Sequence, residues 1–83
     1  MNNRAVGVVA IIVKKRTAAA PEVNRVLTEF GDIVLGRMGL PAADRDVHII
    51  TLIVDADTDQ IGSLTGKLGM IPEVTVKSTL AKM

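Results

Sequence analysis

The stretch Val47-His48-Ile49-Ile50-Thr51-Leu52-Ile53-Val54-Asp55-Ala56 decides how this chain folds. Most of its positions are apolar, β-branched residues recur, and the apolar positions do not follow the spacing of a helix. Such a run predicts a strand that is apolar on both of its faces. Residues 5–13 have the same character. We therefore expect two interior strands, and other parts of the structure must cover both faces of each.

The composition predicts a single domain, residues 1–83, with an aliphatic core. The 83 residues include one Phe but no Trp or Tyr. Ten basic and nine acidic residues leave a net charge of +1, which offers no electrostatic footprint for direct nucleic-acid binding. Cys is absent, which excludes disulfides and thiol catalysis and is typical of cytoplasmic proteins. The apolar run 5–13 is too short to cross a bilayer, so no membrane association is expected.

The residues after the first apolar run predict a helix and a strand. Pro21 suits the first helical position, because the N–H that proline lacks has no partner there. Gly31 is expected as a left-handed cap at the end of the helix. A strand over residues 33–38 follows, broken at Gly39 and Pro41 before a polar turn. One side of the helix carries an apolar stripe: Val23, Val26, Leu27 and Phe30.

The residues after the central stretch predict a second helix and a last strand. Asp57 and Gln60, three positions apart, resemble a capping box at the start of this helix. Gly62 and Gly66 fall on one side of it, which favours a close approach of that side to another surface. Residues 74–80 form a half-polar strand. The apolar stripe of the second helix is Ile61, Leu64 and Leu68.

The resulting order, β-α-β-β-α-β in two matching halves, predicts an α+β fold. It indicates a ferredoxin-like sandwich, with a four-stranded antiparallel sheet of order 4-1-3-2 and two helices on one face. We expect strands 5–13 and 47–56 to lie side by side and parallel, so that both end at one edge. Opposite charges there predict either exposed ion pairs or a site for a charged ligand. The charged residues are Lys14, Lys15 and Arg16 against Asp55, Asp57 and Asp59.

Two helices can cover only one face of such a sheet, yet both central strands are apolar on two faces. Fully burying one of these side chains contributes roughly 1.5–3 kcal/mol, and an uncovered apolar face is normally an interaction site. We predict a homo-oligomer, a dimer or tetramer, that buries the helix-free face or pairs sheet edges. The alternative is that apolar residues alternate between the two faces less strictly than inferred, and that the chain is a monomer. The side chains expected on the uncovered face are Val6, Val8, Ala10 and Ile12, or else the alternate residues of the same strand. Side chains of the other central strand are expected beside them.

The residues offer no catalytic or metal site. His48 is the single histidine, so a metal site would need copies from several subunits, and an ordinary strand histidine is the alternative. Asp55, Asp57 and Asp59 do not continue into a calcium loop, because no Glu closes the pattern. The serines and threonines have no histidine base near them in the sequence, which leaves a nucleophilic triad without support. We expect no enzyme, no metal and no cofactor.

Two segments are similar to one protein family. Leu35-Gly36-Arg37-Met38-Gly39-Leu40-Pro41 and Leu64-Thr65-Gly66-Lys67-Leu68-Gly69 resemble those of the small regulators of the iron-only hydrogenase system. Residues 5–13 and 49–55 resemble that family as well, so the resemblance covers nearly the whole chain. It implies a ferredoxin-like protein related in shape to ACT domains and to the C-terminal domain of the nickel-responsive regulator. It also implies a non-enzymatic regulatory or ligand-sensing module that self-associates.

The residues limit what the resemblance implies. Nickel-responsive regulators gather several histidines and a cysteine, whereas this chain has only His48, so nickel sensing is not expected. Too few residues precede Arg4 for a DNA-binding segment, so an effect on transcription would need a partner.

The ACT-like analogy places a small effector at a subunit interface. Glycines let a ligand or a backbone approach closely, and Arg37 is suited to a carboxylate. A strand bent at its glycines, with Arg37 on the surface, is the alternative. The candidate ligand-binding residues are Gly36, Arg37, Met38 and Gly39 together with Lys14, Lys15 and Arg16.

Three functions remain open on the sequence. The first, which we predict, is a regulatory module that binds a small effector between subunits. The second is a structural interaction module whose assembly is itself the function. The third is a small enzyme, for which the fold offers precedents but the residues offer no catalytic groups.

Overall fold

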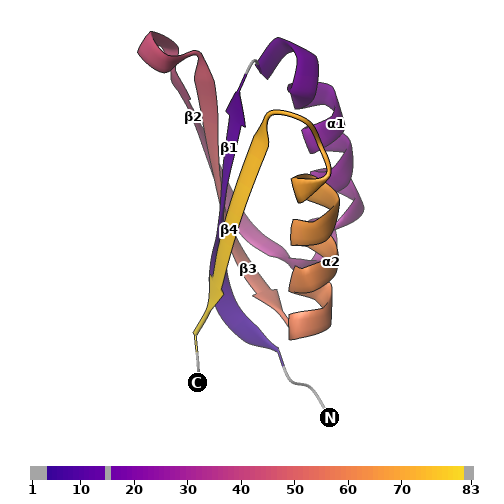
Figure 1. Ribbon diagram of the computed structural model, residues 1–83. Coiled ribbons are helices and arrows are strands. Elements are labelled where there is room, and N and C mark those ends of the chain that lie inside the picture. Colours follow the sequence, from indigo (N-terminus) through magenta and orange to yellow (C-terminus); the bar gives the residue numbers. More distant parts are fainter. Residues whose placement is uncertain (1–3, 15, 82–83) are drawn as a thin grey trace.

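In the computed structural model, which describes residues 4–14 and 16–81, one sheet carries two helices on one side (Figure 1). The strands lie in the order β2-β3-β1-β4, and each neighbouring pair is antiparallel. This confirms the predicted ferredoxin-like sandwich. Two 3-10 turns, Gly31–Ile33 and Ala43–Arg45, precede β2 and β3. The helices and strands are β1 (Ala5–Lys14), α1 (Arg16–Glu29), β2 (Val34–Ala42), β3 (Val47–Ala56), α2 (Thr58–Gly69) and β4 (Val74–Leu80).

The two central strands, β1 and β3, are antiparallel, so the expected parallel pairing is wrong. The connections explain this, because α1 returns the chain to its starting end and β2 then runs in the direction of β1. The short β2–β3 connection reverses the chain again, as in any antiparallel hairpin. Lys14 therefore lies opposite Val47 at one end of the sheet, and Asp55 lies opposite Val6 at the other. The expected meeting of the basic and acidic clusters does not occur.

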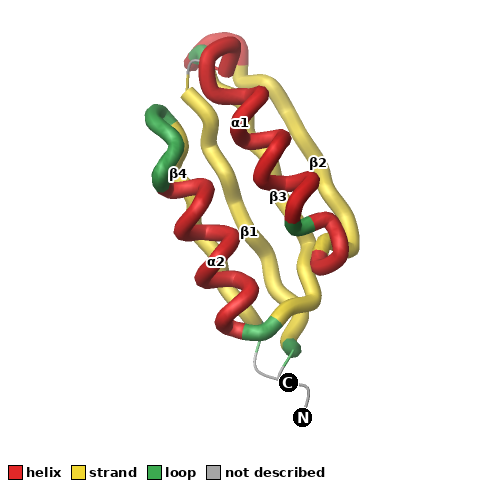
Figure 2. The backbone as a smooth tube through the Cα atoms, turned by 90° about the vertical axis from the view of Figure 1, so that its right-hand side faces the viewer, coloured by secondary structure: helices red, strands yellow, loops and turns green. Residues whose placement is uncertain are grey.

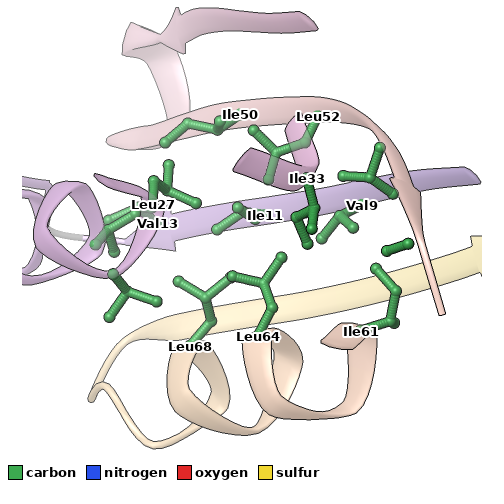
Figure 3. Packing of buried hydrophobic residues seen from close by; sticks show 14 of the residues in the cluster. Val9, Ile11, Val13, Leu27, Ile33, Ile50, Leu52, Ile61, Leu64 and Leu68 are labelled. Atoms are coloured by element: carbon green, nitrogen blue, oxygen red, sulfur yellow. The ribbon is translucent and has the colours of Figure 1, made fainter. Parts of the chain in front are cut away.

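The core lies between the sheet and the helices, which lie over one face of the sheet and roughly along its strands in Figure 2. Figure 3 shows the inner side chains of β1 and β3 pointing toward the stripes of α1 and α2. Both predicted stripes are confirmed: Phe30 is partly buried and the other members are buried. The buried positions are Val9, Ile11, Val13, Ala19, Val23, Val26, Leu27, Ile33, Ile50, Leu52, Val54, Ala56, Ile61, Leu64 and Leu68.

Helix α1 begins at Arg16, five residues before the predicted start at Pro21. Alanine is the strongest helix former, and the run Ala18-Ala19-Ala20 extends the helix toward β1. Pro21 sits inside the helix, where a proline removes the hydrogen bond to the carbonyl four residues earlier. The loss falls close to the helix start, so most of the helical ladder remains.

Strand β2 runs through Gly39 and Pro41 to Ala42, so the predicted break is wrong. β2 is an edge strand, and an edge tolerates a proline because one side of the strand has no hydrogen-bonded neighbour. Gly31 also differs from expectation, because it opens a 3-10 turn instead of adopting the left-handed conformation. In the described part of the chain that conformation occurs at Asp46 (φ 53°) and Glu73 (φ 70°).

Helix α2 begins as predicted. The Gln60 N–H donates to Asp57 Oδ1 at 2.7 Å, and the Asp57 N–H donates to Gln60 Oε1 at 2.9 Å, which completes the capping box. A Cβ added at Gly62 or Gly66 would meet no atom within 4 Å, so none of the described residues packs against that side of α2, and the close approach expected there is not seen within the described chain. Neither helix in the described ranges has the length and apolarity needed to span a bilayer.

Gly7 is required by the close approach of β4 to β1. A Cβ at this position would lie 2.3 Å from the Thr79 carbonyl oxygen and 2.5 Å from Leu80 Cδ2. Gly7→Ala should therefore push the end of β4 away and cost about 1–3 kcal/mol of stability, as overpacking does. Urea denaturation measures this cost. Gly31→Ala is the control, because an added Cβ there meets nothing within 4 Å, and equal stability of the two variants would contradict the prediction.

Candidate functional site

No described helix or loop lies over the side of the sheet away from α1 and α2 (Figure 1), and we term the side chains that point outward there the open face. They follow from the alternation of side chains along a strand and from the strand register. The open face consists of Val6, Val8, Ala10 and Ile12 of β1, Ile49, Thr51 and Ile53 of β3, Gly36, Met38 and Leu40 of β2, and Thr75, Lys77 and Thr79 of β4.

Large apolar side chains on the open face are substantially exposed. Met38 is 60% exposed, Leu40 58% and Ile53 47%, and Val6 and Val8 are 42% and 41% exposed. Of the two sets considered for the first strand, the one that faces outward is therefore Val6, Val8, Ala10 and Ile12, with the first two exposed and the last two half-buried. Contiguous apolar patches of this kind are uncommon on monomers and mark interaction surfaces. The open face is therefore the main candidate for a functional surface.

Charges on the open face are confined to its edge and its ends. Lys77 projects from the edge strand β4, and Lys14 lies at the end nearest the β2–β3 hairpin. At the opposite end, the Arg4 Nη2–H donates to the Asp55 carbonyl oxygen at 2.9 Å, and Arg4 Nε lies 3.6 Å from Asp55 Oδ1. Asp55 thus pairs with Arg4 and not with the basic residues after β1.

The open face is uneven. A hollow of about 180 Å³ lies over β1 and β4 and is lined by Val8, Ala10, Lys77, Ser78 and Thr79. The small side chain of Ala10 contributes to this depression. On the other edge of the sheet, the long exposed side chains of β2 project from the surface. The face therefore has a raised side and a hollowed side.

The structure separates the predicted ligand residues of β2. Gly36 and Met38 lie on the open face, opposite Ile53 and Thr51 of β3. Arg37 points to the helix side, where its Nη2–H donates to the Asn24 side-chain oxygen of α1 at 2.9 Å. Arg37 is therefore directed away from the open face by its place in the strand, and the four residues 36–39 do not form a single cluster.

The predicted basic residues lie away from residues 36–39. Lys14 is exposed and level with Val47 and Ala42, four residues along β2 from Met38, which is about 13 Å at the rise of a strand. Lys15 lies outside the described residues. Arg16 is the first residue of α1, and its side chain is likewise outside the described part. The effector site assembled from these positions thus stays a prediction.

His48 packs against Gly39 across the β2–β3 pair. A Cβ at Gly39 would lie 3.0 Å from His48 Nε2, so the glycine makes room for the imidazole. Among the described residues, no group of three or more His, Cys, Asp or Glu side chains is placed to hold a metal ion. Asp57 is committed to the helix cap, as its spacing from Gln60 predicted.

A second concavity, which no sequence pattern indicated, lies between α1 and the end of α2. It has a volume of about 390 Å³, and Val26, Met70, Ile71 and Pro72 supply its apolar wall. Four charged side chains line the rest of it: Glu22, Arg25, Glu29 and Lys67. These charged groups are bonded mainly to one another, so the cavity offers few free polar groups to a ligand.

The ion pairs around this cavity lie partly within α1, at Glu22 and Arg25, and partly between the helices, where Lys67 of α2 meets Glu29 of α1. Arg25 Nε donates to Glu22 Oε1 at 2.7 Å, and this hydrogen bond raises the pKa of the arginine. Lys67 donates to Glu29, which lowers the pKa of that carboxyl, and its Nζ lies 5.4 Å from the centre of the Phe30 ring. The i, i+3 spacing of Glu22 and Arg25 is visible in the sequence, whereas the pairing of Glu29 with Lys67 depends on the fold.

One family model matches residues 5–78, and its description is "Iron-only hydrogenase system regulator, putative" (TM1266-like). The solved structure of the Thermotoga maritima protein TM1266 is 37% identical in sequence, with a TM-score of 0.91. That match covers 95% of this chain and 99% of the Thermotoga chain. A search of curated proteins found no match.

More distant structures share the fold alone. The ACT domain of the GTP pyrophosphokinase of Chlorobium tepidum has a TM-score of 0.77 at 15% identity, covering 92% of this chain and 99% of that domain. The C-terminal domain of the MgtC protein from Mycobacterium tuberculosis has a TM-score of 0.66 at 18% identity, covering 98% of this chain and 92% of that domain. These matches agree with the predicted ACT-like shape.

Proposed function

This chain belongs to the TM1266-like family of iron-only hydrogenase system regulators, and on that premise we propose that it is a non-enzymatic regulatory module that works as an assembly of identical subunits. The observation that carries the proposal is the open face. Its large apolar side chains, Met38, Leu40 and Ile53 among them, are about half exposed in the single chain. A second copy of the chain is a partner that is always present to cover them.

A small effector is the second part of the proposal. The ACT-like shape supports it only by analogy, since likeness of fold does not transfer a ligand. In the assembly, Gly36 and Met38 lie at the subunit interface that the open face forms, and Arg37 is next to them in sequence but on the helix side. An effector bound near this strand would change how the subunits meet and so pass a signal to a partner protein.

Thermal unfolding with a panel of amino acids, nucleotides and divalent metal ions tests for an effector. A ligand at a hundred times its dissociation constant stabilises the native state by about 2.7 kcal/mol, which raises the Tm of a domain this size by on the order of 10 °C. Arg37→Ala should lose most of that rise if Arg37 binds the effector. Arg45→Ala is the matched control, because Arg45 lies in the exposed turn beyond β2.

The outcomes separate the proposal from its alternative. If no compound raises the Tm while the protein still sediments as an oligomer, the chain is a structural interaction module whose assembly is its function. If a compound raises the Tm equally in the Arg37→Ala variant, the effector binds elsewhere and Arg37 has no part in the site. Sedimentation as a single 8.8 kDa chain across a wide concentration range would refute self-association itself.

A further inference from the structure

Resting on the proposed self-association, we propose that two subunits pack open face against open face about a twofold axis parallel to the strands. In this arrangement β2 of each subunit lies over β4 of the other, and β3 lies over β1. Met38 of each subunit enters the hollow over Ala10 of the other. The partner is thus a second copy of this chain, in one of the two orientations in which a twofold axis between the faces keeps the strands of the two sheets aligned.

The strand registers arrange the open face in rows that cross the sheet from β2 to β4. With the twofold axis parallel to the strands, each row of one subunit faces the same row of the other subunit, and the order of the strands is reversed. With the axis across the strands, each strand faces the same strand of the other subunit, and the order of the rows is reversed. The central rows are Gly36, Ile53, Val8 and Thr79, then Met38, Thr51, Ala10 and Lys77, then Leu40, Ile49, Ile12 and Thr75.

The shape of the face favours the axis parallel to the strands. Met38, 60% exposed, occupies one end of the middle row, and the hollow of about 180 Å³ lies at the other end, over Ala10 and Lys77. Reversal of the strand order places Met38 of each subunit over the hollow of the other subunit, so the interface contains this contact twice. The other axis would set Met38 against Met38 and leave hollow facing hollow, and voids and clashes both destabilise an interface.

The sheet twist does not remove this fit. Aligned sheets pack about 30° apart, which displaces the outer strands by about one residue. The hollow extends along β4 as far as Thr79, so it still receives the side chain of Met38 after such a displacement. The flexible, unbranched side chain of methionine adapts readily to an irregular depression.

The charges are compatible with the same axis. When β1 lies over β3 of the other subunit, Arg4 at the end of one face is near Asp55 of the partner subunit. The opposite orientation brings Lys14 over the Val6 end of the facing β1, beside both Arg4 and Asp55 of the partner subunit, so the shape of the face and not its charge distinguishes the two axes. Lys77 is on an edge strand, where its ammonium group can reach solvent while its stem covers apolar surface.

The area is sufficient for a stable dimer. Four strands about 4.8 Å apart and about nine residues long give each open face about 570 Å². Two such faces together bury about 1,100 Å², which is above the roughly 1,000 Å² expected of a biological interface. A side-by-side pairing of edge strands would leave the large side chains of this face in water.

Cross-linking distinguishes the two axes cleanly, because the chain contains no cysteine. M38C and K77C chains, one carrying a mass tag, are refolded separately and together and treated with a bismaleimide that spans one sheet-to-sheet distance of about 10 Å. We expect the mixture to give a linked M38C–K77C dimer and each separate variant to give none. The axis across the strands predicts the reverse, with each variant linked to itself.

The failure of this arrangement differs from the failure of the proposed function. A protein that sediments as a single chain refutes self-association and this arrangement with it. An oligomer in which M38C links to itself, or in which no sample is linked although every variant gives a cooperative thermal transition, refutes only the arrangement.

A compensating pair of substitutions gives a second measurement without cross-linker. Ala10→Leu fills the hollow and should weaken association at least tenfold, and adding Met38→Ala to the same chain should restore most of it. Positions 10 and 38 are separated by β3 within one subunit, so compensation between them passes through the partner. Met70→Ala is the control for Met38→Ala, because Met70 is 84% exposed and lines the cavity beside α1. Additive effects at positions 10 and 38 would overturn the arrangement.

Discussion

Ile53→Asp should convert the homo-oligomer proposed above to single chains. Ile53 lies on a central strand, opposite Val8 and in the middle of the open face, so any face-to-face packing buries it whichever axis relates the subunits. A buried carboxylate without a partner costs at least about 3 kcal/mol, which weakens association more than a hundredfold. Each dimer carries two such groups. Analytical ultracentrifugation over a range of concentrations measures the change.

The fold of the single chain should survive this substitution, because Ile53 is 47% exposed before assembly. Ser63→Asp adds the same charge on the exposed outer side of α2 and should leave the oligomer unchanged. Far-ultraviolet circular dichroism shows whether each variant is folded. An Ile53→Asp protein that is folded and still assembles like the parent would show that the open face is not the interface.

Leu64→Ala should cause a loss of stability of about 2–5 kcal/mol. Leu64 is fully buried in α2, where Figure 3 shows it pointing toward β1. A domain of this size is only marginally stable, so the variant should be partly unfolded at room temperature or melt far below the parent. The cost combines the lost apolar contacts with a cavity that the surrounding strands cannot close.

Urea denaturation at one fixed protein concentration measures the effect, because the proposed self-association would make the apparent stability depend on concentration. Ser63→Ala, one position away on the exposed side of the same helix, should change the stability by no more than about 0.5 kcal/mol. A Leu64→Ala protein within 1 kcal/mol of the parent, a bound set by the usual cost of such cavities, would mean that α2 packs differently.

The sequence predicted the elements because apolar spacing is a local property. The nearly continuous apolar run in residues 47–56 identified the central strand, and the stripe of Ile61, Leu64 and Leu68 identified the inner side of α2. Strand direction is not a local property, since the same apolar run fits a strand running either way. It follows from the connections, and the parallel pairing inferred for the central strands was wrong for that reason.

Local rules also placed the ends of helices and strands wrongly where the surroundings lower the energetic cost of a proline. Pro21 is tolerated inside α1 because the alanines before it hold the first turns in helical form. Pro41 is tolerated in β2 because that strand is at the edge of the sheet. The hollow over Ala10 and the cavity beside Met70 depend on residues brought together from distant parts of the chain, so no pattern in the sequence could indicate them.

The contact between Lys67 and Phe30 gives the protein a built-in spectroscopic reporter. Phe30 is the single aromatic residue, and it sits where the end of α1 meets α2. Apart from the two imidazole C–H protons of His48, every aromatic proton resonance therefore comes from this one place. The ring current should move the resonances of the Lys67 side chain upfield, and that displacement would disappear as soon as the helices separate. Unlabelled protein is thus enough to follow the helix layer by nuclear magnetic resonance while the sheet binds, dissociates or unfolds.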